Sequence, residues 1–243
     1  QMDRMIYLSM SGAKATMQRQ DVLATNLANA STTGFRAELQ TARAVPLRGD
    51  GASTRVYALE TTTGYNPEAG PITATGRSLD VAMKGNAWLA VQAADGTEAY
   101  TRFGALDVDS QGTLVTTSGR TVLGDGGPIQ VPANAELQIG QDGTISARQG
   151  NGRVTTVGRL KLVTPEQPLQ RGDDSLFRST GGDLPADGNA RLQDGALEGS
   201  NVSAIETMVQ MIAAARQFES QMKMLQTAEK GDQQAAQLLS ING

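Results

Sequence analysis

The sequence of 243 residues contains no cysteine and no histidine. Without cysteine there is no disulfide, no thiolate nucleophile and no cysteine-ligated zinc or iron–sulfur site. Without histidine the chain lacks the commonest general base and the commonest metal ligand. No stretch approaches the roughly 18 apolar residues of a membrane span, and the N-terminal residues are too polar for a signal-peptide core. These absences exclude most hydrolase and metalloenzyme designs, and we expect neither membrane insertion nor a conventional leader.

The charge of the chain is nearly balanced. Lys and Arg together number 21 against 25 Asp and Glu, which gives a net charge of −4. A chain on the acidic side of neutral has no electrostatic reason to bind nucleic acid. The length and the 39% of apolar residues are those of a globular protein with one or two domains. No nucleic-acid partner is therefore expected.

Proline and glycine are concentrated in the middle of the chain. All eight prolines lie there, whereas residues 2–30 and 203–239 hold only two of the 28 glycines and eight of the nine methionines. Both residue types break helices. The two ends are therefore predicted to be long helices, and the middle is not.

Apolar residues at alternating spacings of four and three support both helices. The N-terminal series consists of Ile6, Met10, Ala13, Met17, Gln20, Ala24 and Leu27. The C-terminal series consists of Met208, Met211, Ala215, Phe218, Met222 and Leu225, with Ile205, Val209 and Ile212 forming a second strip beside it. Such series pack helix against helix. Ser203 and Glu206 have the spacing of a capping box, which marks the start of the second helix.

The middle of the chain has the pattern of short β-strands. Apolar or alternating runs occur at 79–83, 87–91, 106–108, 114–115, 129–131, 137–139 and 160–163. Asp-Gly pairs begin at residues 95, 125, 142, 187 and 194, and such pairs favour tight turns. Residues 36–75 show no sustained period and are expected to form an extended connection.

These patterns predict an α+β fold in which long, paired N- and C-terminal α-helices flank an inserted antiparallel β domain. The expected segments are a helix and turn at 2–35, the connection at 36–75, the β domain at 76–199 and the second helix at 200–243. A helix pair with apolar strips on more than one side cannot cover them all by itself. Two interpretations stay open: the strips lie against the chain's own β domain, or other subunits cover them.

Several segments resemble the flagellar rod and hook protein family. They are 26–36 (NLANASTTGFR), 78–85 (SLDVAMKG), 100–104 (YTRFG), 112–116 (GTLVT) and 197–202 (LEGSNV), which occur in this order between the two predicted helices. The start of the chain is more similar to a proximal rod subunit than to a distal one. The resemblance implies a non-enzymatic structural subunit that leaves the cell through the flagellar export apparatus without cleavage. It then polymerises through its terminal helices, with other copies and with proximal and distal rod proteins, into the periplasmic drive shaft that transmits torque.

On this interpretation the helical series become subunit contacts. The expected interface residues are Ile6, Met10, Ala13, Met17, Ala24, Asn26, Leu27, Asn29, Phe35, Ile205, Met208, Met211, Ile212, Ala215, Phe218, Met222 and Leu225. Asn26 and Asn29 offer amide groups that can bind backbone, either in the turn or on a neighbour. Gly34 is expected to adopt a positive φ, Phe35 to anchor the turn that follows, and Trp88 to lie in the core.

Neither a cofactor nor a metal is expected. Asp107, Asp109 and Gly112 resemble the start of a calcium loop, but its twelfth position is Ser118 rather than the bidentate Glu. Two alternative functions stay open. One is a distal rod or hook subunit of the same family, and the other is a two-carboxylate glycosidase acting on peptidoglycan.

Overall fold

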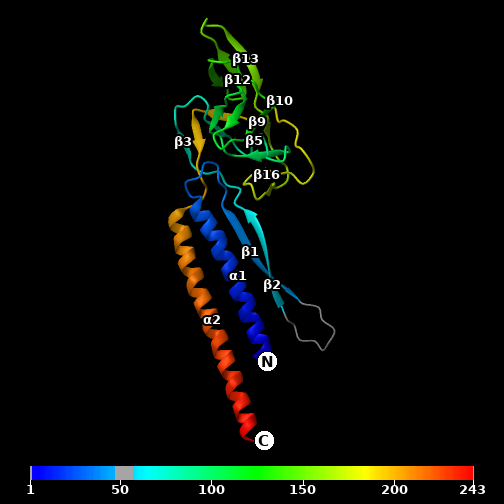
Figure 1. Ribbon diagram of the computed structural model, residues 1–243, viewed down its shortest axis with the longest axis vertical. Helices are drawn as coiled ribbons and strands as arrows, with labels where there is room; N and C mark the ends of the chain where they lie inside the picture. Colours follow the sequence, from blue (N-terminus) through cyan, green and yellow to red (C-terminus); the bar gives the residue numbers. More distant parts are fainter. Residues whose placement is uncertain (1, 47–56, 243) are drawn as a thin grey trace. The chain divides into compact units, whose positions relative to one another are not determined.

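The computed structural model describes residues 2–46 and 57–242, which form two helices and eighteen strands (Figure 1). Contacts divide the chain into two compact units. The helical unit comprises residues 1–28, 38–65 and 202–243, and the β unit comprises residues 29–37 and 66–201. The predicted α+β class is confirmed, because helices at both ends flank a region of antiparallel strands.

The two helices are α1 (Met2–Ala28) and α2 (Ala204–Ile241). Ser203 is the N-cap of α2, and its hydroxyl accepts a hydrogen bond from the Glu206 amide at 3.4 Å, as the capping-box spacing predicts. Gly231 does not interrupt α2, which continues to Ile241. In the described part of the chain, neither helix is long and apolar enough to cross a membrane.

The helices pack side by side and antiparallel (Figure 1). Two hydrogen bonds fix the pairing: the Thr16 hydroxyl donates to Gln221 Oε1 at 3.1 Å, and Gln20 Nε2 donates to the Met211 carbonyl at 3.0 Å. The approach is close at Gly12, where an added Cβ would lie 2.8 Å from Gln221 Nε2. Gly12 therefore leaves room for the Gln221 side chain between the two helices.

A long hairpin completes the helical unit. Strands β1 (Glu38–Pro46) and β2 (Tyr57–Tyr65) pair antiparallel with Glu38 opposite Tyr65, and both contact α1 (Figure 1). Asn26 is buried and joins helix to hairpin, because its Oδ1 accepts from the Glu38 amide at 2.8 Å and its Nδ2 donates to the Glu38 carbonyl at 3.0 Å. The hairpin lies within 36–75, where the sequence pattern predicts an extended connection.

The β unit contains one large sheet and three small ones, all antiparallel. The large sheet has the order β15-β16-β6-β5-β9-β8-β7, with β10 paired to β9 and β14 to β5. Its strands are β5 (Trp88–Gln92), β6 (Glu98–Thr101), β7 (Leu106–Val108), β8 (Leu114–Thr116), β9 (Thr121–Gly124), β10 (Gly127–Pro128), β14 (Leu162–Val163), β15 (Gln170–Arg171) and β16 (Phe177–Arg178). The small sheets are β11 (Glu136–Ile139), β12 (Thr144–Arg148) and β13 (Val154–Arg159); β4 (Val81–Met83) with β17 (Leu192–Asp194); and β3 (Ile72–Ala74) with β18 (Ala196–Glu198).

The hydrophobic core of the β unit lies among these sheets. Val81, Leu89, Leu106, Leu114 and Ile145 are wholly buried in it. Trp88 is also buried, as predicted, and its ring lies 4.7 Å from that of Phe177. The β unit therefore has a core of its own.

Most predicted strands occur, but one prediction is wrong. Residues 129–131 form no strand, and only a single bridge joins Gln130 to Thr113. Two hydrogen bonds flank the bridge, from the Leu114 amide to the Ile129 carbonyl at 3.0 Å and from the Val131 amide to the Gly112 carbonyl at 2.9 Å. The pairing ends at Pro132, which has no amide hydrogen to donate. The predicted Asp-Gly turns at residues 95, 125 and 142 each join two strands that pair antiparallel. The pair at 194 lies between β17 and β18, which pair with β4 and β3 instead.

Candidate functional site

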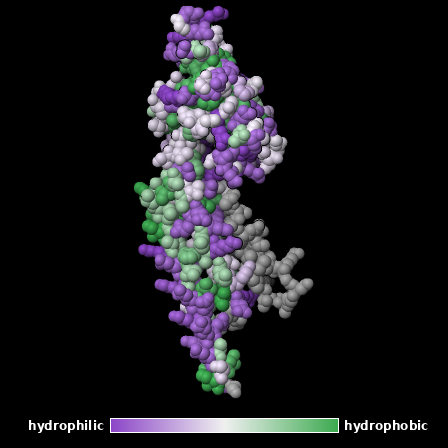
Figure 2. Space-filling model, in the orientation of Figure 1, coloured by the Kyte–Doolittle hydropathy of each residue, from purple (hydrophilic) through white to green (hydrophobic). Residues whose placement is uncertain are grey.

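Large apolar side chains are exposed mainly on the helical unit. Of sixteen such side chains in the described part of the chain, fourteen belong to this unit and only Ile72 and Val154 to the β unit. Those on the helices are Met5, Tyr7, Leu8, Met10, Met17, Ile205, Met208, Val209, Ile212, Met224, Leu238, Leu239 and Ile241, and we call this set the apolar helix surface. Figure 2 shows hydrophobic surface over the beginning of α2 and again at its C-terminal end.

The packing of α1 on α2 explains this exposure. The side chains buried on the helices are mostly small or polar: Ser9, Ala13, Thr16, Leu23, Asn26, Thr207, Ala214 and Ala228. Some larger apolar residues, such as Phe218 and Leu225, are partly buried, but those of the apolar helix surface lie on the exposed sides of the helices. The apolar helix surface is larger than an isolated exposed side chain would give, and such surfaces mark interaction sites.

The predicted interface residues fall into three groups by exposure. Exposed are Met10, Met17, Ala24, Ile205, Met208, Ile212 and Ala215. Partly buried are Ile6, Leu27, Asn29, Phe35, Met211, Phe218, Met222 and Leu225, whereas Ala13 and Asn26 are buried. Asn26 uses both amide groups on Glu38 of its own chain. The exposed group gives the predicted contact an accessible surface, and Val209 and Leu8 extend it beyond the predicted set.

The segment after α1 belongs to the β unit and turns sharply. Asn29 accepts from Thr32 through both its carbonyl and its side-chain oxygen. Gly34 has a φ of +71°, as predicted, and donates its amide hydrogen to the Glu198 carbonyl at 2.8 Å. A Cβ at Gly34 would lie 2.5 Å from the Arg102 carbonyl carbon. Both the backbone angle and the close approach therefore require glycine here.

Phe35 is held by a cation rather than by an apolar pocket alone. The Arg171 guanidinium lies 4.9 Å from the Phe35 ring centroid and 5.1 Å from that of Phe177. Arg171 also donates a hydrogen bond to the Arg36 carbonyl. Cation–π contacts of this kind stabilise partly buried aromatic rings. Phe35 thus anchors the turn within its own chain.

Three buried charges meet beside this turn. The Glu198 carboxylate accepts hydrogen bonds from Arg102 Nε at 2.8 Å and from Arg102 Nη2 at 3.0 Å. Arg36 Nη2 lies 3.3 Å from Glu198 Oε1. The remaining donors of Arg102 bind the carbonyls of Met83, Gly85 and Ala87. Buried charges need such partners, because removing them from water is costly. We call Arg36, Arg102 and Glu198 the buried ion-pair cluster.

Asn201 fastens the other side of the same turn. Its Oδ1 accepts from the Ala37 amide at 2.6 Å, and its Nδ2 donates to the carbonyls of Asn66 and Glu68 at 3.0 and 2.9 Å. Its backbone amide donates to Phe35 O at 3.1 Å. One side chain therefore ties together three stretches of backbone that are distant in sequence.

Three family models match the chain. The flagella basal body rod protein model matches residues 6–36, the flagellar hook protein FlgE/F/G D1 domain matches 82–147, and the flagellar basal body rod FlgEFG C-terminal model matches 193–238. The chain is 47% identical to the flagellar basal-body rod protein FlgF of Salmonella typhimurium, with 99% of this chain and 100% of that protein covered. The chain belongs to the flagellar basal-body rod protein family.

Other relatives in the rod protein family are similar over nearly their whole length. FlgF of Escherichia coli is 46% identical, with 99% of this chain and 100% of that protein covered. FlgG of Bacillus subtilis, also a flagellar basal-body rod protein, is 31% identical, with 93% and 96% covered. The chain is thus most like FlgF.

The buried ion-pair cluster joins the three segments that carry the rod family likeness. Arg36 comes from the first matched segment, Arg102 from the second and Glu198 from the third. The sequence patterns single out these segments but not the pairing among them. The only feature of the sequence that points to the pairing is the single charged residue in each of the motifs 26–36, 100–104 and 197–202.

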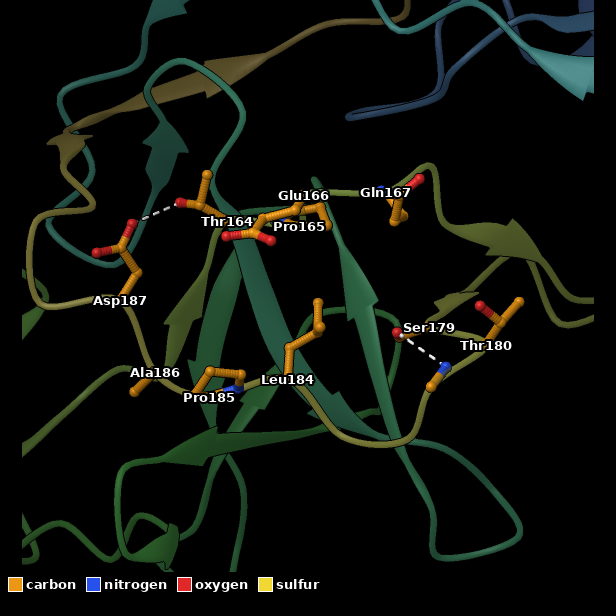
Figure 3. Close-up of a pocket in the computed structure, with 11 residues that line it drawn as sticks. Thr164, Pro165, Glu166, Gln167, Ser179, Thr180, Leu184, Pro185, Ala186 and Asp187 are labelled. Atoms are coloured by element: carbon orange, nitrogen blue, oxygen red, sulfur yellow. Dashed lines mark hydrogen bonds between the residues drawn. The ribbon is translucent and has the colours of Figure 1, made fainter.

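A cavity of about 720 Å³ lies in the β unit, lined by residues 164–167, 179–181 and 184–187 (Figure 3). Its ionisable side chains are Glu166 and Asp187. The Thr164 hydroxyl donates to Asp187 at 2.7 Å, and this bond holds the pKa of the Asp187 carboxyl below its usual value. A glycosidase needs one carboxylic acid whose pKa is raised. Asp187 is shifted in the opposite direction.

The calcium-like motif has a structural role. Asp109 Oδ1 accepts from the amides of Gln111 and Thr113, both at 2.9 Å, and closes the turn between β7 and β8. Within residues 2–46 and 57–242, no group of three carboxylate-bearing residues is placed to hold a metal ion.

Proposed function

We propose that this chain is a structural, non-enzymatic subunit of the proximal rod of the bacterial flagellum. Its apolar helix surface binds other copies of the chain and neighbouring rod proteins, so that α1 and α2 form the inner, polymerised layer. The β unit forms the outer layer and stiffens the shaft that transmits torque. Delivery by the flagellar export apparatus without a cleaved signal is part of the same proposal and is supported by the family resemblance.

The observation that carries the proposal is the location of exposed apolar residues. Thirteen of the sixteen described large exposed apolar side chains lie on α1 and α2. Val209 and Ile212 are 60% and 57% exposed, respectively, although α2 already packs against α1. When two such faces meet, each Å² of apolar surface that is buried favours association by about 25 cal/mol. Because the chain belongs to the rod protein family, a second rod subunit is the partner that covers this surface.

Two observations favour this function over the alternatives. Four FlgF proteins are 32–47% identical to the chain and four FlgG proteins are 30–31% identical, which supports a proximal rather than a distal rod subunit. The lowered pKa of Asp187 makes this carboxyl unsuited to act as the general acid of a peptidoglycan-active glycosidase at the cavity. A digestion of purified peptidoglycan that releases soluble fragments would support the enzyme instead.

The test places a charge on the apolar helix surface. Val209→Asp and Ile212→Asp each put an ionised carboxylate where the proposal buries a side chain, and neither residue is in the buried core. In cells that contain only the variant, we expect loss of motility and no incorporation into purified basal bodies. Circular dichroism and Trp88 fluorescence of the purified variants should match the unsubstituted chain, because the β unit is untouched.

The matched control is Gln210→Asp, an exposed polar position between the two. It adds the same charge to the same helix without replacing an apolar side chain, and we expect normal incorporation. Normal incorporation of the Val209 and Ile212 variants would overturn the proposal.

A further inference from the structure

The methionines whose burial the structure describes range from exposed to fully buried, with Met211 and Met222 partly buried. Met5, Met10, Met17, Met208 and Met224 are exposed on α1 and α2, and Met10 and Met17 are each 57% exposed. Met83, the one methionine of the β unit, is 1% exposed in the hydrophobic core. We call the five exposed side chains the exposed methionines. Exposure of the thioether sulfur is what controls attack by an oxidant in solution.

We infer that the exposed methionines form an oxidation-sensitive modification site that controls assembly, with hydrogen peroxide or a related peroxide as the oxidant. This inference rests on the proposed function, because it requires the apolar helix surface to be buried on assembly. The modification acts on the free subunit, before neighbours cover the helices.

The chemical step is a two-electron oxidation of each sulfur. The thioether attacks one peroxide oxygen, the O–O bond breaks and an S–O bond forms, which gives methionine sulfoxide. The other oxygen leaves as water after taking up the proton. A methionine sulfoxide reductase reverses the step with two thiol equivalents, which become a disulfide while the sulfoxide oxygen leaves as water. The chain supplies no thiol of its own, since it has no cysteine.

The consequence follows from the surface on which the exposed methionines lie. A sulfoxide oxygen is a strong hydrogen-bond acceptor that must lose its water when two helix faces meet, and an unpaired buried polar group is costly. Met10 and Met17 are seven residues apart and therefore lie on one face of α1. Met208 neighbours Ile205, Val209 and Ile212 on the exposed part of α2. Oxidation of both helices thus makes the contact surface polar while the core of the β unit stays intact.

The first measurement is the rate of oxidation at each methionine. The purified full chain is treated with hydrogen peroxide, and the peptides are quantified by mass spectrometry. We expect the exposed methionines to oxidise at least about tenfold faster than Met83, the internal reference. Equal rates at Met83 and at the exposed methionines would overturn the inference.

The second measurement tests the effect on assembly. A variant carrying Met→Leu at positions 5, 10, 17, 208 and 224 keeps apolar side chains of similar volume that peroxide does not oxidise. Cells that contain either the original chain or this variant are exposed to sublethal peroxide while flagella assemble. We expect incorporation of the original chain into basal bodies to fall at least about tenfold, a change equivalent to one desolvated polar group, whereas the leucine variant is unaffected.

Matched variants keep the outcomes distinct. Met83→Leu should remain as sensitive as the original chain, and overexpression of a methionine sulfoxide reductase should restore its incorporation. If the variant with five leucines assembles poorly without peroxide, a double variant with Met10→Leu and Met208→Leu gives the same comparison. Its protection against peroxide should be smaller. Equal loss, or no loss, in original and leucine chains overturns the inference. The proposed function itself fails separately, if Val209→Asp incorporates normally.

Discussion

Arg36 and Glu198 form an ion pair with an N–O distance of 3.3 Å, and their side chains are only 3% and 1% exposed. The pair joins the turn that follows α1 to the end of β18, within the β unit. Arg102 binds the same carboxylate. Both buried guanidinium groups depend on this one carboxylate, because its loss leaves Arg36 and Arg102 without their anionic partner.

Removal of the shared carboxylate should therefore be severe. Glu198→Ala leaves Arg36 and Arg102 buried without an anionic partner, and we expect it to lower the free energy of unfolding by about 3–5 kcal/mol. Urea unfolding followed by Trp88 fluorescence measures this change. Asp174→Ala is the control, because it breaks the more exposed pair with Arg178 and should cost about 1 kcal/mol or less. Equal losses in both variants would contradict a special role for the cluster.

Gly34 and Gly76 offer a matched comparison of backbone strain and steric contact. Both have a φ of +71°, but a Cβ at Gly76 meets nothing within 4 Å, whereas at Gly34 it meets backbone at 2.5 Å. Gly76→Ala should cost about 1–2 kcal/mol through its backbone angle alone. Gly34→Ala should cost more, as measured by urea unfolding. The same cost at both positions would show that the contact with Arg102 is not tight.

Asn201 should be sensitive to the loss of either half of its amide. Asn201→Ala removes three hydrogen bonds, and at about 1 kcal/mol each we expect a loss near 3 kcal/mol. Asn201→Asp keeps the acceptor for Ala37 but places an oxygen against two carbonyls, so it should also destabilise. The exposed Asn151→Ala is the control. An Asn201→Asp variant with the stability of the original chain would refute the assigned amide orientation.

Tyr100 gives the β unit a dependence on alkaline pH. Burial, together with its 2.6 Å hydrogen bond to Glu98, raises the pKa of the Tyr100 phenol well above its ordinary value of 10.0. The folded state therefore favours the neutral phenol. Its contribution to stability is complete below pH 10 and falls as the pH rises above that value. Urea unfolding of Tyr100→Phe should lose less stability above pH 10 than the original chain; identical pH profiles would contradict this assignment.

Local patterns were sufficient to predict the helices and many of the turns. The absence of proline from both ends, together with Ser203 and Glu206, located α2, and the Asp-Gly pairs located several hairpins. The β1–β2 hairpin was not predicted, because neither strand alternates apolar with polar residues. Its pairing depends on contacts with α1 and on the Asn26 amide, which a local pattern does not contain.

The heptad series predicted that the apolar residues form strips along the two helices. It did not predict which strip packs against the other helix of the same chain. Ala13 is buried, whereas Met10 and Met17 of the same series are exposed. The buried ion-pair cluster was also beyond local patterns, because its members come from three separate segments. Each charge alone resembles an ordinary surface residue, and only the fold brings the three together.

The most direct test of the account is photo-crosslinking in purified basal bodies, with p-benzoylphenylalanine placed at residue 209 and, as a control, at residue 177, where a buried phenylalanine is replaced by its analogue. The exposed position 209 should crosslink to a second polypeptide, identified by mass spectrometry as another copy or another rod protein. The buried position 177 should crosslink only within its own chain. Crosslinks from residue 209 that stay within one chain would show that the apolar helix surface is covered by the subunit itself, and would contradict the account.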